Sequence, residues 1–205
     1  METAFLITAF ATLFVVIDPP GLIPMFIALT PGMSSEQRRV IGARACVIAV
    51  IILTLFGLLG EAVLGVVGIS MSAFRIAGGV LLFLTALDML FERRTQRREG
   101  QSAVPDHDPS VFPIAIPLIA GPGAIATMIL LVGESGGSWQ GILTVYLVMI
   151  FVVSLAFLLF LIAGPLERAL GRTGTVVITR LLGMLLAALS VQFIIDGIIG
   201  TGLIG

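Results

Sequence analysis

Two short motifs rich in proline and glycine could bind a small polar solute. Asp18-Pro19-Pro20-Gly21 interrupts a long apolar run near the start of the chain, and Gly121-Pro122-Gly123 interrupts a second run in the other half. Proline removes backbone donors, and glycine lets a ligand approach the backbone closely. We therefore expect each motif to break a helix and to offer backbone groups for binding rather than for bond cleavage.

Each predicted break offers groups of both polarities. Carbonyl groups at the end of the preceding half-helix attract cations, and N–H groups at the start of the next half-helix suit an anion. We expect unpaired carbonyls at 14–17 and 118–120, and free N–H groups at 21–23 and 123–125. The predicted substrate-binding residues are Asp18, Pro20, Gly21, Leu22, Gly121, Pro122, Gly123, Ala124 and, outside the motifs, Gln192.

Asp18 is the acid predicted to lie deepest in the membrane, because Glu61, Asp88, Glu167 and Asp196 all fall near the ends of apolar runs. One interpretation is a helix cap that accepts hydrogen bonds from the N–H groups of residues 21 or 22. The other is that Asp18 also binds a coupling proton or cation, or a substrate ammonium group. The two interpretations are compatible, and the sequence leaves both open.

Other polar side chains at the expected membrane depth are Thr12, Thr85, Thr127, Ser154, Ser190 and Gln192. Serine and threonine commonly donate to a carbonyl of their own helix, so we expect most of these hydroxyls to be satisfied locally. Gln192 cannot bond back so easily and is the better candidate ligand. Arg75 and Arg180 could pair with Glu61 and Glu167, or extend to the membrane interface.

The elements that position these motifs are membrane-spanning helices. The chain has 205 residues, of which 58% are hydrophobic and 11% charged, whereas soluble domains are about half apolar and a quarter charged. A crossing needs about 20 mostly apolar residues. The expected fold is an all-α integral membrane protein with discontinuous first and fourth helices and six spans, near 4–29, 41–65, 70–91, 112–132, 141–164 and 176–199.

Arginine placement predicts the orientation. The loops after the first, third and fifth spans carry Arg38, Arg39, Arg93, Arg94, Arg97, Arg98, Arg168 and Arg172, and the opposite loops carry none. The positive-inside rule then places these loops in the cytoplasm and both termini outside. Re-entrant hairpins in place of the broken spans would separate Arg168 and Arg172 from the other basic loops, so we favour six crossings. The composition suggests the inner membrane of a prokaryote.

The two halves of the chain resemble each other. Pro20-Gly21 aligns with Pro122-Gly123, and the segment 75–78 aligns with 180–183. This similarity predicts a first three-helix repeat at 1–91, a cytoplasmic linker at 92–111 and a second repeat at 112–205. Because each repeat has three crossings, the second enters the membrane from the opposite side, as in many secondary transporters.

Composition argues against several other functions. A net charge of −1 offers no basic patch for nucleic acid. Cys46 has no partner for a disulfide or a metal site, His107 lies in the charged linker and is expected to be solvated, and no cofactor is expected. An intramembrane serine protease would need a histidine or lysine base at depth, and Asp88 and Asp196 fall at opposite membrane faces. We expect no enzymatic activity.

The runs from Asp18 to Phe26 and from Pro117 to Ile125 together resemble the MarC family, named for multiple antibiotic resistance. The resemblance covers nearly the whole chain and implies transport of small neutral amino acids such as glycine or alanine. Many members have Asn where this chain has Asp18, so the acid could alter coupling or substrate charge.

Together the residues and the resemblance predict a secondary transporter of a small polar solute, most plausibly a neutral amino acid. It would work by alternating access at a midplane site formed by the two breaks, with proton or sodium coupling as an option. The alternative is a passive channel or a regulatory membrane protein that transports nothing. The expected partners are the solute and membrane lipid, with self-association left open.

Overall fold

The computed structural model describes residues 2–91 and 108–202, apart from some side chains between 167 and 175. All elements are helical. They are α1 (Glu2–Ile17), α2 (Pro19–Leu29), α3 (Ser35–Val67), α4 (Met71–Leu90), η1 (Ser110–Ile119), α6 (Pro122–Glu134), α7 (Trp139–Leu161) and α8 (Ala163–Gly200). Most of the predicted linker, including His107 and four of its arginines, lies outside the described residues.

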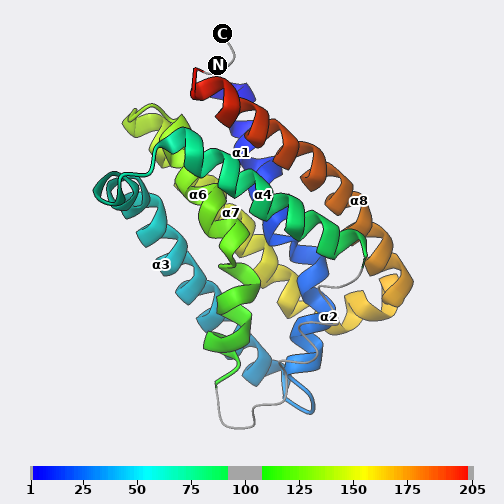
Figure 1. The fold of residues 1–205 in the computed structure, drawn as a ribbon. Coiled ribbons are helices and arrows are strands. Elements are labelled where there is room, and N and C mark those ends of the chain that lie inside the picture. Colours follow the sequence, from blue (N-terminus) through cyan, green and yellow to red (C-terminus); the bar gives the residue numbers. More distant parts are fainter. Residues whose placement is uncertain (1, 92–107, 203–205) are drawn as a thin grey trace.

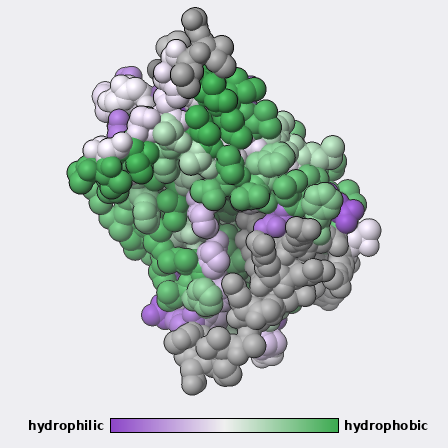
Figure 2. All heavy atoms as spheres, in the orientation of Figure 1, coloured by the Kyte–Doolittle hydropathy of each residue, from purple (hydrophilic) through white to green (hydrophobic). Residues whose placement is uncertain are grey.

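The helices are long and apolar enough to cross a membrane. Within the described residues five helical segments qualify, or six if η1 and α6 together form one span. Apolar residues cover most of the coloured part of the face seen in Figure 2. The all-α membrane class and the approximate spans are therefore confirmed. The η1–α6 pair could cross or re-enter, so the preference for six crossings stays a prediction.

The helices run alternately up and down the bundle (Figure 1). α1 and α2 descend from the end where α1 begins, and η1 and α6 rise antiparallel to them. The beginning of α1 and the end of α8 lie at the same end of the bundle. α8 is non-helical at Gly171 (φ 60°, ψ 173°), and its candidate span covers Val176–Gly200.

Local sequence signals fix several helix boundaries. Ser34 and Gln37 form a reciprocal capping box at the start of α3, and Gly68 ends that helix in the left-handed conformation (φ 78°). Ser70 caps α4 through the backbone N–H of Ala73. At the opposite end of the bundle, the Arg38 guanidinium donates to the carbonyl of Thr30, just after α2.

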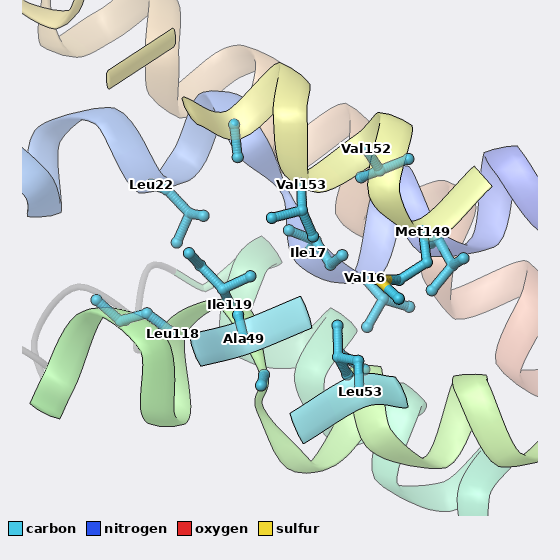
Figure 3. Packing of buried hydrophobic residues seen from close by; sticks show 14 of the residues in the cluster. Val16, Ile17, Leu22, Ala49, Leu53, Leu118, Ile119, Met149, Val152 and Val153 are labelled. Carbon is cyan, nitrogen blue, oxygen red and sulfur yellow. The ribbon is translucent and has the colours of Figure 1, made fainter. Parts of the chain in front are cut away.

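The largest buried cluster surrounds the two breaks (Figure 3). Ile17 and Leu22 flank the first break, Leu118 and Ile119 precede the second, and all four are almost fully buried. Leu22 and Ile119 point toward one another in Figure 3. The midpoint of the bundle is thus a packed apolar layer through which both breaks pass.

Glycines allow close contacts between helices at several positions, among them Gly57 and Gly60 of α3. A Cβ on Gly60 would lie 2.5 Å from Ile129 Cγ1, and one on Gly57 would lie 2.7 Å from the Tyr146 hydroxyl. Such distances are shorter than real Cβ contacts, so a larger residue at either position would require the Ile129 or Tyr146 side chain to move. The absence of a side chain thus lets α3 pack closely against its neighbours.

The same applies where α4 and α8 pack. A Cβ on Gly79 would lie 2.8 Å from the Ser190 carbonyl oxygen, and one on Gly183 would lie 3.3 Å from the Ala86 carbonyl oxygen. Each glycine thus faces a backbone carbonyl of the other helix. The two backbones approach closely along an extensive antiparallel contact.

Candidate solute site at the two helix breaks

The first break interrupts the helical hydrogen bonds with little change of direction. Asp18 adopts a left-handed conformation (φ 53°, ψ 61°), which Asp tolerates better than most residues. Its N–H donates to the Phe14 carbonyl at 2.9 Å, and its carbonyl accepts from the Leu22 N–H at 3.1 Å. The predictions of an unpaired Phe14 carbonyl and a free Leu22 N–H are therefore wrong.

The Asp18 side chain caps α2. Its Oδ1 accepts a hydrogen bond from the Gly21 N–H at 3.1 Å, and the residue is only 1% exposed. The cap interpretation is confirmed, and Gly21 does not offer a free N–H group as predicted. Whether Asp18 also binds a ligand is a separate question that the cap leaves open.

Gly21 makes room for Asp18 rather than for a ligand. A Cβ at this position would lie 2.0 Å from Asp18 Oδ2 and 2.6 Å from its Cγ. The sequence interpretation assigned the glycine to close approach by a solute. Instead, the carboxylate of the same turn already occupies that space.

The second break bends the chain by 55° between η1 and α6. Gly121 is extended (φ −80°, ψ 169°), and among the described residues no side chain caps the start of α6. Ile125 donates to the Gly121 carbonyl at 3.0 Å, so it is not the free donor that was predicted. The N–H groups of Gly123 and Ala124 precede the first intrahelical donor and have no partner within the helix.

Gly121 is required by the backbone at this bend. A Cβ there would lie 2.5 Å from the Pro117 carbonyl oxygen. η1 itself is irregular, with extended conformations at Phe112 and Ile116. The prediction that the fourth segment is broken near its middle is confirmed.

The structure brings the two breaks together. A Cβ on Gly123 would lie 3.4 Å from Val16 Cγ1, two residues before Asp18. On another side it would lie 3.3 Å from Leu82 Cδ2 and 3.6 Å from Thr85 Oγ1 of α4. The start of α6 therefore packs between the last turn of α1, which leads into the first break, and α4.

Gln192 lies elsewhere on the molecular surface. Its side chain is exposed and donates to Asp196 Oδ1 at 2.7 Å. The residues of the breaks are mostly buried, whereas the Gln192 side chain is exposed. Its amide is already bonded to Asp196 on the same face of α8. Its predicted role as a ligand is not tested by this arrangement.

The hydroxyl side chains within the helices divide into two groups. Thr85 donates to the Leu81 carbonyl and Ser190 to the Ala187 carbonyl, as expected. Thr12 and Thr127 are fully buried, yet within the described part of the chain their Oγ1 atoms have no hydrogen-bond partner. The expectation of local bonding is wrong for these two. Sequence could not separate the groups, because all four are hydroxyl residues in apolar helices.

Arg75 pairs with Glu134 rather than with Glu61. Arg75 Nη2 lies 3.3 Å from Glu134 Oε1, and both side chains are about three-quarters buried. Glu61 is exposed. Glu134 was not predicted from the sequence as a partner of Arg75, although it is an acidic residue just after a predicted span. The pair joins the end of α6 to α4.

At the start of η1, Asp108 holds the chain to α3. Its Oδ1 accepts from the Ser110 hydroxyl at 2.7 Å and from the Ser110 N–H at 3.0 Å. Its Oδ2 also pairs with the Arg44 guanidinium. The two hydrogen bonds from Ser110, with a smaller contribution from Arg44, hold the pKa of the Asp108 carboxyl below its usual range.

Comparison with known proteins supplies the family. The model of the MarC family of integral membrane proteins matches residues 3–201. The chain belongs to the MarC family. A UPF0056 membrane protein of Archaeoglobus fulgidus is 39% identical over 95% of this chain and 92% of its own length.

Two bacterial relatives show the same extent of similarity. The UPF0056 membrane protein YhcE of Escherichia coli is 37% identical over 93% of this chain and 90% of its own length. YvbG of Bacillus subtilis is 34% identical over 100% of this chain and 97% of its own length. No solved structure matches the chain significantly. The family assignment thus rests on full-length sequence similarity.

Proposed function

We propose that this MarC protein is a secondary transporter of a small polar solute, with a neutral amino acid as the best candidate. The observation that carries the proposal is the buried Asp18 side chain at the first break, together with the uncapped start of α6, which packs against the last turn of α1. An acid within a membrane span is by default a functional candidate, because burial costs several kcal/mol unless the group is paired, hydrated or protonated.

The two breaks supply complementary charge. At the first break the N–H groups of Gly21 and Leu22 are bonded to the side chain and the backbone carbonyl of Asp18, so this break offers the carboxyl group of Asp18 rather than free donors. At the second break the N–H groups of Gly123 and Ala124 precede the first intrahelical bond, where the helix dipole favours an anion. A zwitterion would place its ammonium near Asp18 and its carboxylate at the start of α6.

An inverted repeat would give the two exposed states that alternating access needs. The contacts between α4 and α8 support this organisation. Gly79 faces the Ser190 carbonyl and Gly183 faces the Ala86 carbonyl, and 104 residues separate Gly79 from Gly183 and Ala86 from Ser190. In this register Gly79, rather than Gly78, corresponds to Gly183. We propose 1–91 and 112–205 as the two halves.

The remaining features of the transporter are proposals of the same kind. Asp18 would also be the residue that binds a coupling proton or sodium ion. Both termini would face outward in a prokaryotic inner membrane, with the arginine-bearing loops in the cytoplasm. A transporter of this type would act on the solute without chemical change.

Counterflow in proteoliposomes tests the proposal. Purified wild type is expected to exchange labelled for unlabelled alanine or glycine, and Asp18→Asn is expected to slow the exchange at least about tenfold. Asn can still adopt the left-handed conformation and accept from Gly21, so its melting temperature should stay near that of wild type. Asp108→Asn, an acid outside the spans, is the control.

Three results would contradict the proposal. Equal exchange by wild type and Asp18→Asn would show that the carboxylate has no part in transport. Solute flux without stimulation by solute on the other side would indicate a passive channel. The absence of any flux for small neutral amino acids would favour a regulatory protein.

A further inference from the structure

Two unpaired hydroxyls lie in the buried interior near the breaks. Thr12 and Thr127 are 0% exposed, and among the residues that the structure describes neither Oγ1 has a hydrogen-bond partner. A buried polar group without a partner is unfavourable, and each such group calls for an explanation such as a ligand or water. Thr30 offers the contrast, because its equally buried hydroxyl donates to the Phe26 carbonyl at 2.8 Å.

Helix register places the two hydroxyls at a similar level of the bundle on neighbouring helices. The contact between Val16 and Gly123 fixes the alignment of α1 with α6, and the two helices run antiparallel (Figure 1). Thr12 lies four residues before Val16, and Thr127 lies four residues after Gly123. Residues four apart share one helix face. Thr12 therefore lies about one turn from Val16, and Thr127 about one turn from Gly123, and because the helices are antiparallel both lie in the same direction from the breaks.

The same face of α6 continues to the end of the bundle. Gly123, Thr127, Leu130 and Glu134 follow the spacing of a single helix face. α4 runs beside it, with Thr85 near Gly123, Gly78 near Leu130 and Arg75 paired with Glu134. We call this series of four α6 residues the α6 stripe. It connects the paired breaks with the buried ion pair.

We propose that the α6 stripe is the half-pathway through which the solute passes between the breaks and this end of the bundle. The hydroxyls of Thr12 and Thr127 are its intermediate binding position, and the Arg75–Glu134 pair closes its end. The inference rests on the proposed transport function and adds to it the route and the residues along it. In the structure described here the route is closed, because apolar packing and the ion pair fill it.

The chemistry of the stripe suits a small zwitterion or another solute with both donors and acceptors. Each threonine hydroxyl can donate one hydrogen bond and accept others, so the pair can serve an ammonium and a carboxylate in turn. Arg75 Nε is also buried without a partner in the described part of the chain. When the ion pair opens, this arginine is placed to receive the carboxylate of the solute.

Valine substitutions test the intermediate position. Thr12→Val, Thr127→Val and the double variant keep the shape of the side chain and remove the hydroxyl. Alanine counterflow should slow about fivefold in each single variant and more in the double, as expected for loss of one hydrogen bond to a solute. Their melting temperatures should equal or exceed that of wild type, because no protein hydrogen bond is lost.

Thr30→Val is the matched control, since it removes a buried hydroxyl that is already bonded. It should lower the melting temperature and leave counterflow by the folded protein unchanged. Unchanged counterflow in the Thr12 and Thr127 variants, with wild type active, would overturn the inference and leave the proposed function standing. A wild type that exchanges nothing would instead overturn the proposed function.

Cysteine accessibility gives a second readout that does not depend on transport rates. Cys46 is buried and is first replaced by Ala. Thr127→Cys in that background should react with a small thiosulfonate reagent in liposomes. Free alanine, added as the solute, should slow the reaction. Ala156→Cys, at a fully buried core position of α7, should stay unreactive. Thr127→Cys that reacts no faster than Ala156→Cys, or whose reaction alanine does not slow, would overturn the inference.

Discussion

The two breaks interrupt their helices by different means. At the first, one left-handed residue and its carboxylate carry the chain from α1 into α2 within a single candidate span. At the second, backbone alone makes the turn, through an extended glycine and a bend of 55°. The Asp18 side chain therefore caps the start of α2, whereas among the described residues no side chain caps the start of α6.

This difference explains how two similar motifs acquire opposite polarity. A capping carboxylate uses up N–H groups and leaves negative charge, whereas an uncapped helix start keeps its N–H groups and its positive dipole end. The difference between the two breaks is thus visible in the hydrogen bonds as well as in the residue types. Substitutions at Gly121 and Gly21 test the two ways of interrupting a helix separately.

Gly121→Ala should have the largest effect. The added Cβ would meet the Pro117 carbonyl oxygen at 2.5 Å, and this backbone atom cannot move without changing the bend. We expect a loss of about 2 to 4 kcal/mol in unfolding free energy, measured as a lower melting temperature in detergent. Gly65→Ala in α3, where a Cβ meets nothing within 4 Å, is the control and should be neutral or stabilising.

A Gly121→Ala variant as stable as wild type would mean that the second break does not depend on its glycine. The bend between η1 and α6 would then be set by the prolines of η1 alone, and not by the backbone of Gly121.

Gly21→Ala should have an intermediate effect, because the obstacle is a side chain that can rotate away. The added Cβ would lie 2.0 Å from Asp18 Oδ2, so the carboxylate must leave and the cap is lost, at a cost of about 1 to 2 kcal/mol. In an Asp18→Gly background the same substitution should cost little, since the carboxylate is absent and glycine suits the left-handed turn.

The double-mutant cycle measures this dependence directly. Chemical or thermal unfolding of the two single variants and the double should give a coupling energy of about 1 kcal/mol or more. Independent effects of the two substitutions would show that Gly21 is required for some reason other than the Asp18 carboxylate.

Asp108→Ala should have the smallest effect, because this side chain is partly exposed and anchors only the start of η1. Its pKa is lowered in the folded protein, so its contribution is present above the ordinary Asp pKa of about 3.9. That contribution is lost as pH falls through the lowered value. We expect a difference of about 0.5 kcal/mol at neutral pH, shrinking in acid when melting is followed from pH 7 to pH 3.

Conversely, a difference between wild type and Asp108→Ala that persists or grows in acid would reject the ionised carboxylate as the source of stability. Arg44→Gln should reproduce only part of the effect, since the hydrogen bonds from Ser110 contribute more to the pKa shift.

Sequence reasoning was sufficient for the membrane class, the spans and the two breaks, because these depend on long apolar runs and on proline and glycine. It was insufficient for hydrogen bonds at single residues. The partners of Phe14, Leu22 and Ile125 follow from the left-handed turn at Asp18 and the bend at Gly121, and neither conformation is encoded by residue type alone. The unpaired state of Thr12 and Thr127 depends on how neighbouring helices pack against them, and a single sequence does not show this packing.

The left-handed turn at residue 18 also limits which substitutions can survive there. The position needs a residue that tolerates this conformation and whose side chain reaches the Gly21 N–H group, and Asp and Asn meet both conditions. The codons of these two residues differ by one base. A single mutation can therefore exchange a carboxyl for an amide within this span while the turn is retained. Under the proposed function, such a step would change the chemistry of the solute site without passing through an unfolded intermediate.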